Sequence, residues 1–471
     1  MEIYRLFIDG IWQDGVMGTR DIVSPSTEKA VARIPVAGLV DLGRCLAAAV
    51  RERDPWAKTD VSQRAAILRR TAEILARKIP HTVRQMVGEQ GKTLSEASDE
   101  LDRSLETFLW NARQAEELCK PVHIDELRTL LYDPVGVVAA FTPWNYPAVI
   151  TARKLAPALA AGCTVILKAA EEAPAAAVAI IEALHEAGVP RGVVALVFGD
   201  PPMISTHLLG SPEVRMVTFT GSTRVGKELA VLAARNLQTC VLELGGHSPV
   251  LVFEDADIST TVRAICEYKF EYAGQSCNAP SRIFVQRSRY LDFARQLVGL
   301  AAEIRVGPGE DPDVQMGPMI GPQGPARMQR LTEDAVEKGA CLALGGHPLE
   351  RKGYFWPPTV LTDVPSAARI MSEEPFGPIL AIAPFETLDQ AIELANLSSY
   401  GLASYVFTLS EKTQRDVVER LSGGSVSINI LKGVAPDVPI TGTGDSGYGH
   451  EGGQEGFRAF QSLKLINRTG R

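Results

Sequence analysis

Through the middle of the chain, short apolar runs rich in β-branched residues alternate with longer stretches of helical periodicity. The helical stretches lie near residues 148–160, 174–187, 201–209 and 224–235, and the runs between them have the pattern of buried strands. This alternation predicts a parallel, doubly wound α/β sheet. Because such sheets bind ligands at the carboxyl ends of their strands, functional residues are expected directly after each strand. The five predicted strands are VGVVAAF, CTVILKA, VVALVF, RMVTFTG and TCVLEL.

The ends of the chain have different patterns. The first hundred or so residues are predicted to be mostly helical, because SQRAAILRRTAEILARKI places its apolar residues at helical spacing. A second α/β stretch starts near residues 255–259 and runs to about 430. The segment VHIDELRTLLYDP and the tail FRAFQSLKLINRTGR both have strand patterns. An arm and a tail strand of this kind suggest pairing across a subunit interface.

Composition narrows the class of protein. The chain has 471 residues, of which 45% are hydrophobic and 22% charged, as is typical of a folded protein with two or three domains. Its formal net charge is −8, so we expect neither a nucleic acid nor a membrane as partner. The N-terminus lacks the features of a signal peptide and the seven cysteines form no C-x-x-C pair, which predicts a cytoplasmic protein with reduced thiols. The scattered histidines give no ligand spacing, so no metal is expected.

Two strand ends carry residues suited to a phosphate or a ribose. GSTRVGK at 221–227 has P-loop spacing, but Glu228 stands where a triphosphatase needs a Ser or Thr for magnesium. What remains is a glycine-rich turn into a helix, which suits a pyrophosphate, although a plain tight turn explains it equally well. Lys168 and Glu171 follow the second strand. A carboxylate there can accept hydrogen bonds from ribose hydroxyls, which favours NAD over NADP; a solvated helix entry is the alternative.

Three further residues have the chemistry of covalent catalysis. Cys277 lies in the polar segment AGQSCNAP, where a thiolate could attack a carbonyl carbon and later leave. Glu243, ahead of two glycines, is a candidate general base, or alternatively a surface charge at a strand end. Asn145, between Trp144 and Tyr146, offers an amide donor for an oxyanion, unless it is only a turn residue.

Five motifs in order along the chain, PWNYP, TGS, ELGG, GQSC and EEPFGP, resemble the aldehyde dehydrogenase superfamily, and the resemblance extends from FIDGIW to SGYGHEGG. It implies that Cys277 is the nucleophile, Glu243 the general base and Asn145 the oxyanion donor. It also implies that NAD, with NADP as an alternative, is bound with Glu374 on the nicotinamide ribose. The residues that would bind the cofactor are Thr142, Pro143, Trp144, Lys168, Glu171, Gly221, Ser222, Leu244, Glu374 and Phe376.

The resemblance also implies a fold and an assembly. A Rossmann-like dinucleotide-binding domain would comprise residues 1–119 and 138–245, and a catalytic domain residues 246–436. Residues 120–137 and 437–471 would form a β-strand oligomerisation arm and a tail. Such chains are expected to form homodimers or homotetramers.

The implied reaction is oxidation of an aldehyde to a carboxylic acid through a thiohemiacetal and a thioester on Cys277. Arg153 aligns with an arginine that succinate-semialdehyde dehydrogenases use on the substrate carboxylate, which suggests a small semialdehyde such as succinate semialdehyde. Their second arginine falls at Glu271, where a carboxylate would oppose an anionic substrate or attract an amine. His247 departs from the usual ELGGKSP and is expected at the cofactor rim or substrate mouth. The alternatives are a CoA-acylating semialdehyde dehydrogenase and a non-catalytic dinucleotide-binding protein of the same fold.

Overall fold

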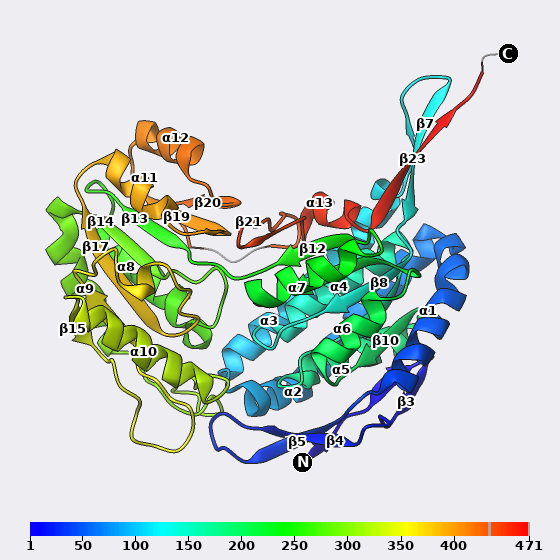
Figure 1. Cartoon of the computed structure of the whole chain (residues 1–471), viewed down its shortest axis with the longest axis horizontal. Coiled ribbons are helices and arrows are strands. Elements are labelled where there is room, and N and C mark those ends of the chain that lie inside the picture. Colours follow the sequence, from blue (N-terminus) through cyan, green and yellow to red (C-terminus); the bar gives the residue numbers. More distant parts are fainter. Residues whose placement is uncertain (432–434, 470–471) are drawn as a thin grey trace.

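A computed structural model describes residues 1–431 and 435–469. An eight-stranded sheet forms the centre of the first lobe, whose buried core runs from Tyr4 to Leu244 with Phe457 and Phe460 (Figure 1). Its five central strands are parallel, as predicted, and short antiparallel strands close both edges. In spatial order the strands are β22 (Gly447–Tyr448), β12 (Thr239–Glu243), β11 (Val214–Thr220), β8 (Val137–Phe141), β9 (Thr164–Lys168), β10 (Val194–Val197), β2 (Leu6–Ile8) and β3 (Ile11–Gln13).

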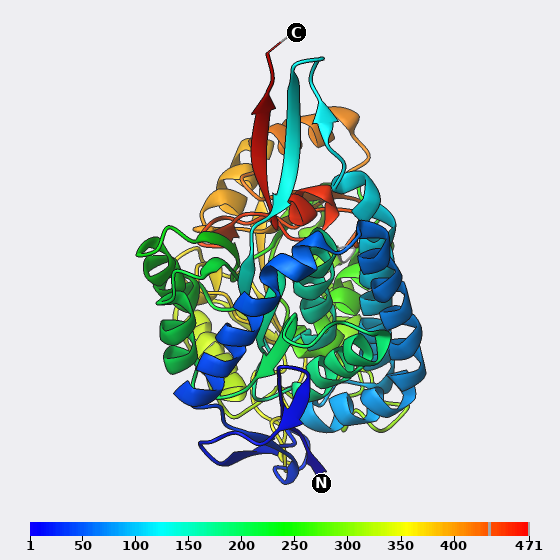
Figure 2. The same cartoon turned by 90° about the vertical axis from the view of Figure 1, so that its right-hand side faces the viewer.

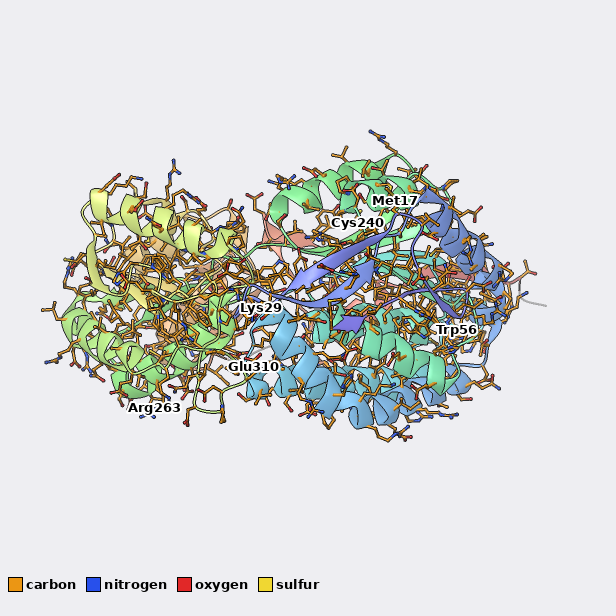
Figure 3. The ribbon with its side chains drawn as sticks, turned by 90° about the horizontal axis from the view of Figure 1, so that it is seen from below. Met17, Lys29, Trp56, Cys240, Arg263 and Glu310 are labelled. Carbon is orange, nitrogen blue, oxygen red and sulfur yellow. The ribbon has the colours of Figure 1, made fainter. Side chains whose placement is uncertain are left out.

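Helices cover both faces of this sheet, so it is doubly wound (Figure 3). The first group is α2 (Val61–Gln90), α3 (Leu94–Leu118), α4 (Pro147–Ala161) and α5 (Pro174–Ala187), which pack on one another. The second group is α1 (Leu39–Lys58), α6 (Pro201–Leu209) and α7 (Thr223–Ala234), in which α6 contacts both neighbours. The helix α3 begins with a capping box, in which the side chains of Thr93 and Glu96 each accept a hydrogen bond from the other residue's backbone N–H.

The second lobe has its own sheet and its own core, whose buried residues run from Val250 to Leu421. All strands of this sheet are parallel except β15 at one edge. In spatial order they are β15 (Cys341–Leu344), β16 (Thr359–Thr362), β17 (Ile379–Phe385), β14 (Arg282–Gln286), β13 (Pro249–Val252), β19 (Ala403–Phe407) and β20 (Ser425–Ile428). The helices of this lobe are α8 (Ile258–Phe270), α9 (Tyr290–Ala302), α10 (Gln323–Glu337), α11 (Leu388–Asn396) and α12 (Glu411–Arg420), with 3₁₀ turns at Glu271–Gly274, Arg287–Arg289 and Arg369–Met371.

The N-terminal segment contains strands that the helical expectation missed. Besides β2 and β3, it forms a small sheet of β1 (Glu2–Ile3), β5 (Ala30–Pro35) and β4 (Thr19–Val23). The turn between β4 and β5 reaches the second lobe, where the Tyr354 N–H donates to the Pro25 carbonyl over 2.9 Å. Figure 3 shows Lys29, in the same turn, at the junction of the two lobes. The α1–α3 helices follow as expected.

A three-stranded arm projects from the first lobe (Figures 1 and 2). It consists of β6 (Val122–His123), β7 (Arg128–Pro134) and the tail strand β23 (Gln461–Asn467). The predicted tail strand pairs with the arm of its own chain, antiparallel over the whole length of β7. A short helix, α13 (Gly453–Arg458), precedes the tail, and β18 (Tyr400–Gly401) pairs with β21 (Thr443–Gly444). In the described ranges, none of the helices combines the length and the apolar character required to cross a bilayer.

Candidate active site

Residues at the carboxyl ends of the parallel strands line a cavity of about 330 Å³ between the two lobes. Loops after β8, β11 and β12 form its wall on the first lobe, and residues around 268–278 and 374–376 form its wall on the second. The structure brings most of the predicted site residues into this one cavity, as expected for a doubly wound sheet. They are Pro143, Trp144, Asn145, Arg153, Gly221, Ser222, Glu243, Leu244, Glu271, Cys277, Glu374 and Phe376.

Cys277 is half-buried and follows a tight turn. Tyr272 and Ala273 both adopt positive φ, at 47° and 51°, so the chain reverses sharply just before the thiol. A Cβ on Gly246 would lie 2.0 Å from the Cys277 carbonyl oxygen. Only glycine at position 246 therefore allows the segment after β12 to pass so close to the backbone of Cys277. Burial, followed by the charges of Glu374 and Glu243, raises the pKa of the Cys277 thiol to about 12. The thiol is therefore protonated at neutral pH, and attack on a carbonyl requires a nearby base or positive charge.

Asn145 is buried and its side chain is directed at the turn that carries Cys277. Its Nδ2 donates to the Gln275 carbonyl over 3.1 Å. From α2, the Gln90 amide donates to the backbone carbonyls of Trp144 and Asn145. Because an amide nitrogen carries two hydrogens, one N–H of Asn145 remains for an oxyanion in the cavity.

Glu243 ends β12 and is buried, and its Oε1 has no hydrogen-bond partner among the described residues. Burial is the main reason that its pKa lies well above the ordinary range, and the nearby Glu451 carboxylate raises it further. The cations Lys154 and Arg153 oppose this shift. A carboxyl group with raised pKa and an unbonded oxygen facing a cavity is suited to take a proton from water.

Behind Glu243 lies a buried ion pair that sequence reasoning missed. Lys154 of α4 forms a salt bridge with Glu451 and donates to Thr218 Oγ1 over 2.9 Å. Thr218 Oγ1 in turn donates to Glu451 over 3.1 Å. The only local signal was a lysine inside the apolar helix sequence that follows Asn145, and its partner lies 297 positions away.

A second cavity, of about 500 Å³, adjoins the first and shares Trp144, Arg327 and Phe376 with it. Glu171 lines this second cavity. Its carboxylate accepts from Lys168 Nζ over 2.8 Å and from the Gly199 N–H over 3.1 Å. Trp144 and Phe376 meet edge-to-face, with ring centroids 5.5 Å apart, between the two cavities.

Two of the predicted cofactor residues lie behind the walls of these cavities. Lys168 and Thr142 are buried, and neither belongs to the described residues that line them. The Thr142 N–H donates to the Lys168 carbonyl over 3.1 Å. Lys168 therefore acts on the cavity through its ion pair with Glu171.

The joined cavities fit a dinucleotide. Ser222 caps α7, whose positive N-terminal end lies at the cavity wall and suits a pyrophosphate. A Cβ on Gly245 would lie 2.7 Å from Glu374 Oε2, so the glycine leaves that carboxylate room at the wall. Burial raises the pKa of Glu374 to about 7, and its Oε1 accepts from the Gly246 N–H over 2.9 Å. The buried hydroxyl of Thr220 has no hydrogen-bond partner among the described residues, which leaves it to a ligand.

A doubly wound sheet with a dinucleotide-sized cleft, next to a thiol, an amide and a carboxyl group, defines a dinucleotide-dependent oxidoreductase. Comparison with known proteins identifies the family of oxidoreductases to which the chain belongs. Residues 12–466 match the model of the aldehyde dehydrogenase family, and the chain belongs to that family. It is an NAD(P)-dependent aldehyde dehydrogenase that acts on small aldehydes.

Among its relatives, 4-(hydroxymethyl)benzenesulfonate dehydrogenase TsaD1 of Comamonas testosteroni is 42% identical, over 99% of this chain and 98% of the relative. Succinate-semialdehyde dehydrogenase [NADP(+)] GabD of Escherichia coli K12 is 35% identical, over 98% of this chain and 97% of the relative. The crystal structure of betaine aldehyde dehydrogenase from Staphylococcus aureus in complex with NAD+ is similar with a TM-score of 0.94. It is 33% identical, and the match covers 98% of this chain and 94% of that one.

The two predicted substrate residues both line the catalytic cavity. Arg153 is buried on α4, and burial lowers its pKa from the ordinary arginine value. Glu271 accepts a hydrogen bond from the Tyr146 hydroxyl over 3.1 Å and lies 3.8 Å from Arg103 of α3. Arg103, which sequence reasoning missed, also lines the cavity.

The expectation that His247 lies at the rim of the site is wrong. Its ring is buried in the second lobe, with Nδ1 2.7 Å from Ser281 Oγ and Nε2 2.9 Å from the Ile370 carbonyl. Burial and the neighbouring Arg282 hold the pKa of His247 well below its ordinary range, so the ring is neutral. His247, which stands where ELGGKSP has lysine, is therefore a hydrogen-bonded residue of the core.

Proposed function

We propose that this enzyme oxidises its aldehyde through a covalent thioester on Cys277. The observation that carries the proposal is that Cys277, Asn145 and Glu243 share one cavity beside the dinucleotide cleft. Glu243, in its carboxylate form, takes the thiol proton of Cys277 and passes it to solvent, the sulfur adds to the aldehyde carbon, and the Asn145 side chain donates to the resulting oxyanion. A nicotinamide dinucleotide held in the adjoining cleft would supply the acceptor for the hydride that leaves the adduct. Glu243 then takes a proton from the water that hydrolyses the thioester, which releases the carboxylic acid.

The cofactor is proposed to be NAD in preference to NADP. Glu171 supports this choice, because its carboxylate lines the second cavity, where it would accept bonds from ribose hydroxyls and repel a 2′-phosphate. Lys168 partly offsets that repulsion, so NADP is expected to bind more weakly rather than not at all. The kcat/KM with NAD should exceed that with NADP, and the reverse order would remove Glu171 from this role.

The substrate is proposed to be a small aldehyde with an anionic group, such as succinate semialdehyde. Arg153 supports this, since it places a buried cation in the wall of the catalytic cavity. The names of two relatives agree, one specifying a benzenesulfonate and the other a succinate semialdehyde. The test is a panel of anionic, neutral and cationic aldehydes assayed for NADH formation. Faster oxidation of the anionic members is expected, and a preference for cationic ones would contradict it.

Water, and not CoA, is proposed to take the acyl group. The presence of the buried carboxyl group of Glu243 supports hydrolysis, because a CoA-acylating enzyme does not require this base. Product analysis with and without CoA separates the two reactions, and formation of acyl-CoA would contradict hydrolysis. Absence of NADH formation across the whole panel would contradict the proposed reaction.

The assembly and location are also proposed. The projecting arm, which lies within the proposed segments 120–137 and 437–471, is expected to join chains into homodimers or homotetramers. The dinucleotide-binding domain would keep the bounds 1–119 and 138–245, and the catalytic domain 246–436. A cytoplasmic location is also proposed. It is supported by the seven cysteines, all of which are free, because thiols stay reduced in the cytosol.

A further inference from the structure

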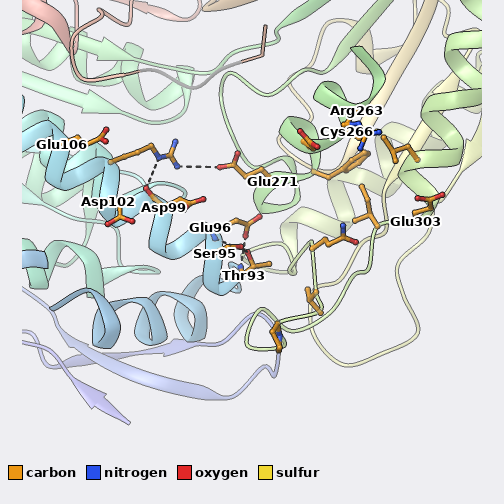
Figure 4. Close-up of a pocket in the computed structure, with 18 residues that line it drawn as sticks. Thr93, Ser95, Glu96, Asp99, Asp102, Glu106, Arg263, Cys266, Glu271 and Glu303 are labelled. Carbon is orange, nitrogen blue, oxygen red and sulfur yellow. Dashed lines mark hydrogen bonds and ion pairs between the residues drawn. The ribbon is translucent and has the colours of Figure 1, made fainter. Parts of the chain in front are cut away.

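Arg103 and Glu271 stand where the catalytic cavity meets a larger groove. Both residues line the cavity of Cys277 and also the groove, whose volume is about 940 Å³. In Figure 4, Glu271 faces the helix α3 that carries Asp99 and Asp102. This pair of opposite charges therefore lies at the outer end of the catalytic cavity.

The guanidinium of Arg103 is held loosely. Its Nη2 lies 3.8 Å from Glu271 Oε1, its Nε donates to the Asp99 carbonyl over 3.3 Å, and it lies 5.6 Å from the centre of the Tyr146 ring. The side chain is 36% exposed, so it is free to turn. An arginine has five N–H donors in a planar fork, which matches a carboxylate or a sulfonate bidentately.

Glu271 does not depend on Arg103 alone. Its Oε1 accepts a hydrogen bond from the Tyr146 hydroxyl over 3.1 Å. When Arg103 turns toward a ligand, Glu271 therefore keeps a donor, and the contact can be exchanged without leaving a bare carboxylate. Arg153 lines the same cavity from α4, so cations on two different helices border the space in front of the thiol.

We propose that Arg103 forms an anion subsite at the outer end of the catalytic cavity, where it binds the carboxylate or sulfonate of the aldehyde substrate. The inference rests on the proposed function and names the residue that selects the substrate's charge. It also accounts for Glu271, since the cation expected at position 271 is supplied from α3 and Glu271 lies beside it, 3.8 Å away. The groove carries the carboxylates of Glu96, Asp99, Asp102, Glu106, Glu267 and Glu303, so an anionic group at this opening needs a cation beside it.

The test compares substrates that differ in charge, using the full-length enzyme saturated with NAD. Succinate semialdehyde is paired with butanal, 4-sulfobenzaldehyde with benzaldehyde, and betaine aldehyde serves as the cationic probe. Arg103→Gln should lower the ratio of kcat/KM for the anionic over the neutral member of each pair by about 10- to 100-fold, mainly through KM. Arg103→Lys should restore part of the ratio. Arg113→Gln, an exposed arginine on the same helix, is the matched control and should leave the ratio unchanged.

Two results would overturn the anion subsite. One is an unchanged ratio in Arg103→Gln, with both members of each pair affected equally. The other is a preference for betaine aldehyde that is lost in Glu271→Gln, because the Glu271 carboxylate, and not Arg103, would then bind the charged group of the substrate. Failure of the proposed function is distinct from both, since in that case the unaltered enzyme would form no NADH with any aldehyde of the set.

Discussion

At the scale of single residues, the site depends on how burial shifts protonation. Both the Cys277 thiol and the Glu243 carboxyl group have raised pKa values, and burial is the largest cause for each. The protonated Glu243 cannot act as a base, so hydrolysis of the thioester should become faster as pH rises through its pKa. Glu451 contributes to this shift, and its salt bridge with Lys154 fixes where its charge lies.

Replacing Glu451 tests this dependence. Glu451→Gln removes a negative charge near Glu243 and leaves Lys154 unopposed, and both changes lower the pKa of Glu243. The acid limb of the pH profile of kcat, measured with a substrate for which hydrolysis limits the rate, should therefore move to lower pH. Glu455→Gln, an exposed carboxylate on α13, is the control. A limb that stays in place or moves to higher pH would show that Glu451 does not set the protonation of Glu243.

Sequence reasoning found the residues that short motifs carry, which are Asn145 after β8, Glu243 at the end of β12 and Cys277 in the loop before β14. It missed Lys154, Glu451 and Arg103, because each acts through a partner on a distant segment. Lys154 and Glu451 are 297 positions apart, and Arg103 meets Glu271 only when α3 packs beside the turn after α8. No local pattern encodes such pairs.

At the scale of elements, the 89–100 segment fixes the loop that carries Asn145. Glu100 Oε1 accepts from the N–H of Ala148 over 2.7 Å and of Val149 over 3.3 Å, and so caps the first turn of α4. Lys92 neutralises Glu100 in a fully buried salt bridge, and its Nζ lies 4.2 Å from the centre of the Tyr146 ring. The loop that carries the amide donor for the oxyanion is thereby held by α3 and by the segment that joins α2 to α3.

Breaking that buried pair should be costly. Glu100→Gln leaves the Lys92 cation without its counter-ion in the core, so the free energy of unfolding should fall by about 3–5 kcal/mol. Urea unfolding followed by circular dichroism measures the change. Glu116→Gln, exposed on the same helix, should change the free energy of unfolding by less than about 0.5 kcal/mol. Equal stability of the two variants would mean that the Lys92–Glu100 pair does not anchor α4.

Helices and strands could be predicted from the sequence where they are long or mostly apolar. The five central strands were predicted because each is a short run rich in apolar and β-branched residues, as buried parallel strands are. The N-terminal strands β1 to β5 were not, since each has two to six residues and lies in a small sheet or in the last two strands at one side of the large sheet. Runs that short have no clear period, and tertiary pairing decides their structure.

At the scale of the whole molecule, the projecting arm presents apolar side chains to solvent. Leu463 and Leu465 of β23 are 62% and 51% exposed, and Val122 and Ile124 near β6 are also exposed. An exposed sheet with apolar side chains is typical of an interface between subunits. The arm's pairing across subunits stays a prediction.

Charge on this strand tests the assembly. The double change Leu463→Asp with Leu465→Asp should prevent association, because two carboxylates would then be buried at the interface. Light scattering after size-exclusion chromatography should give a multiple of 50.8 kDa for the unaltered chain and about 50.8 kDa for the variant. Ser462→Asp, at an exposed position of the same strand, is the control. Association of the leucine variant, or a monomeric unaltered chain, would contradict the role of the arm.

The covalent intermediate on Cys277 is tested most directly by peptide mass spectrometry of the Glu243→Gln variant, quenched in acid after mixing with NAD and an aldehyde that the unaltered enzyme oxidises. Slow hydrolysis in this variant should leave the acyl group on the peptide that contains Cys277, and Cys277→Ala should abolish both the adduct and NADH formation. An acyl group on another cysteine, or continued NADH formation by Cys277→Ala, would contradict the account.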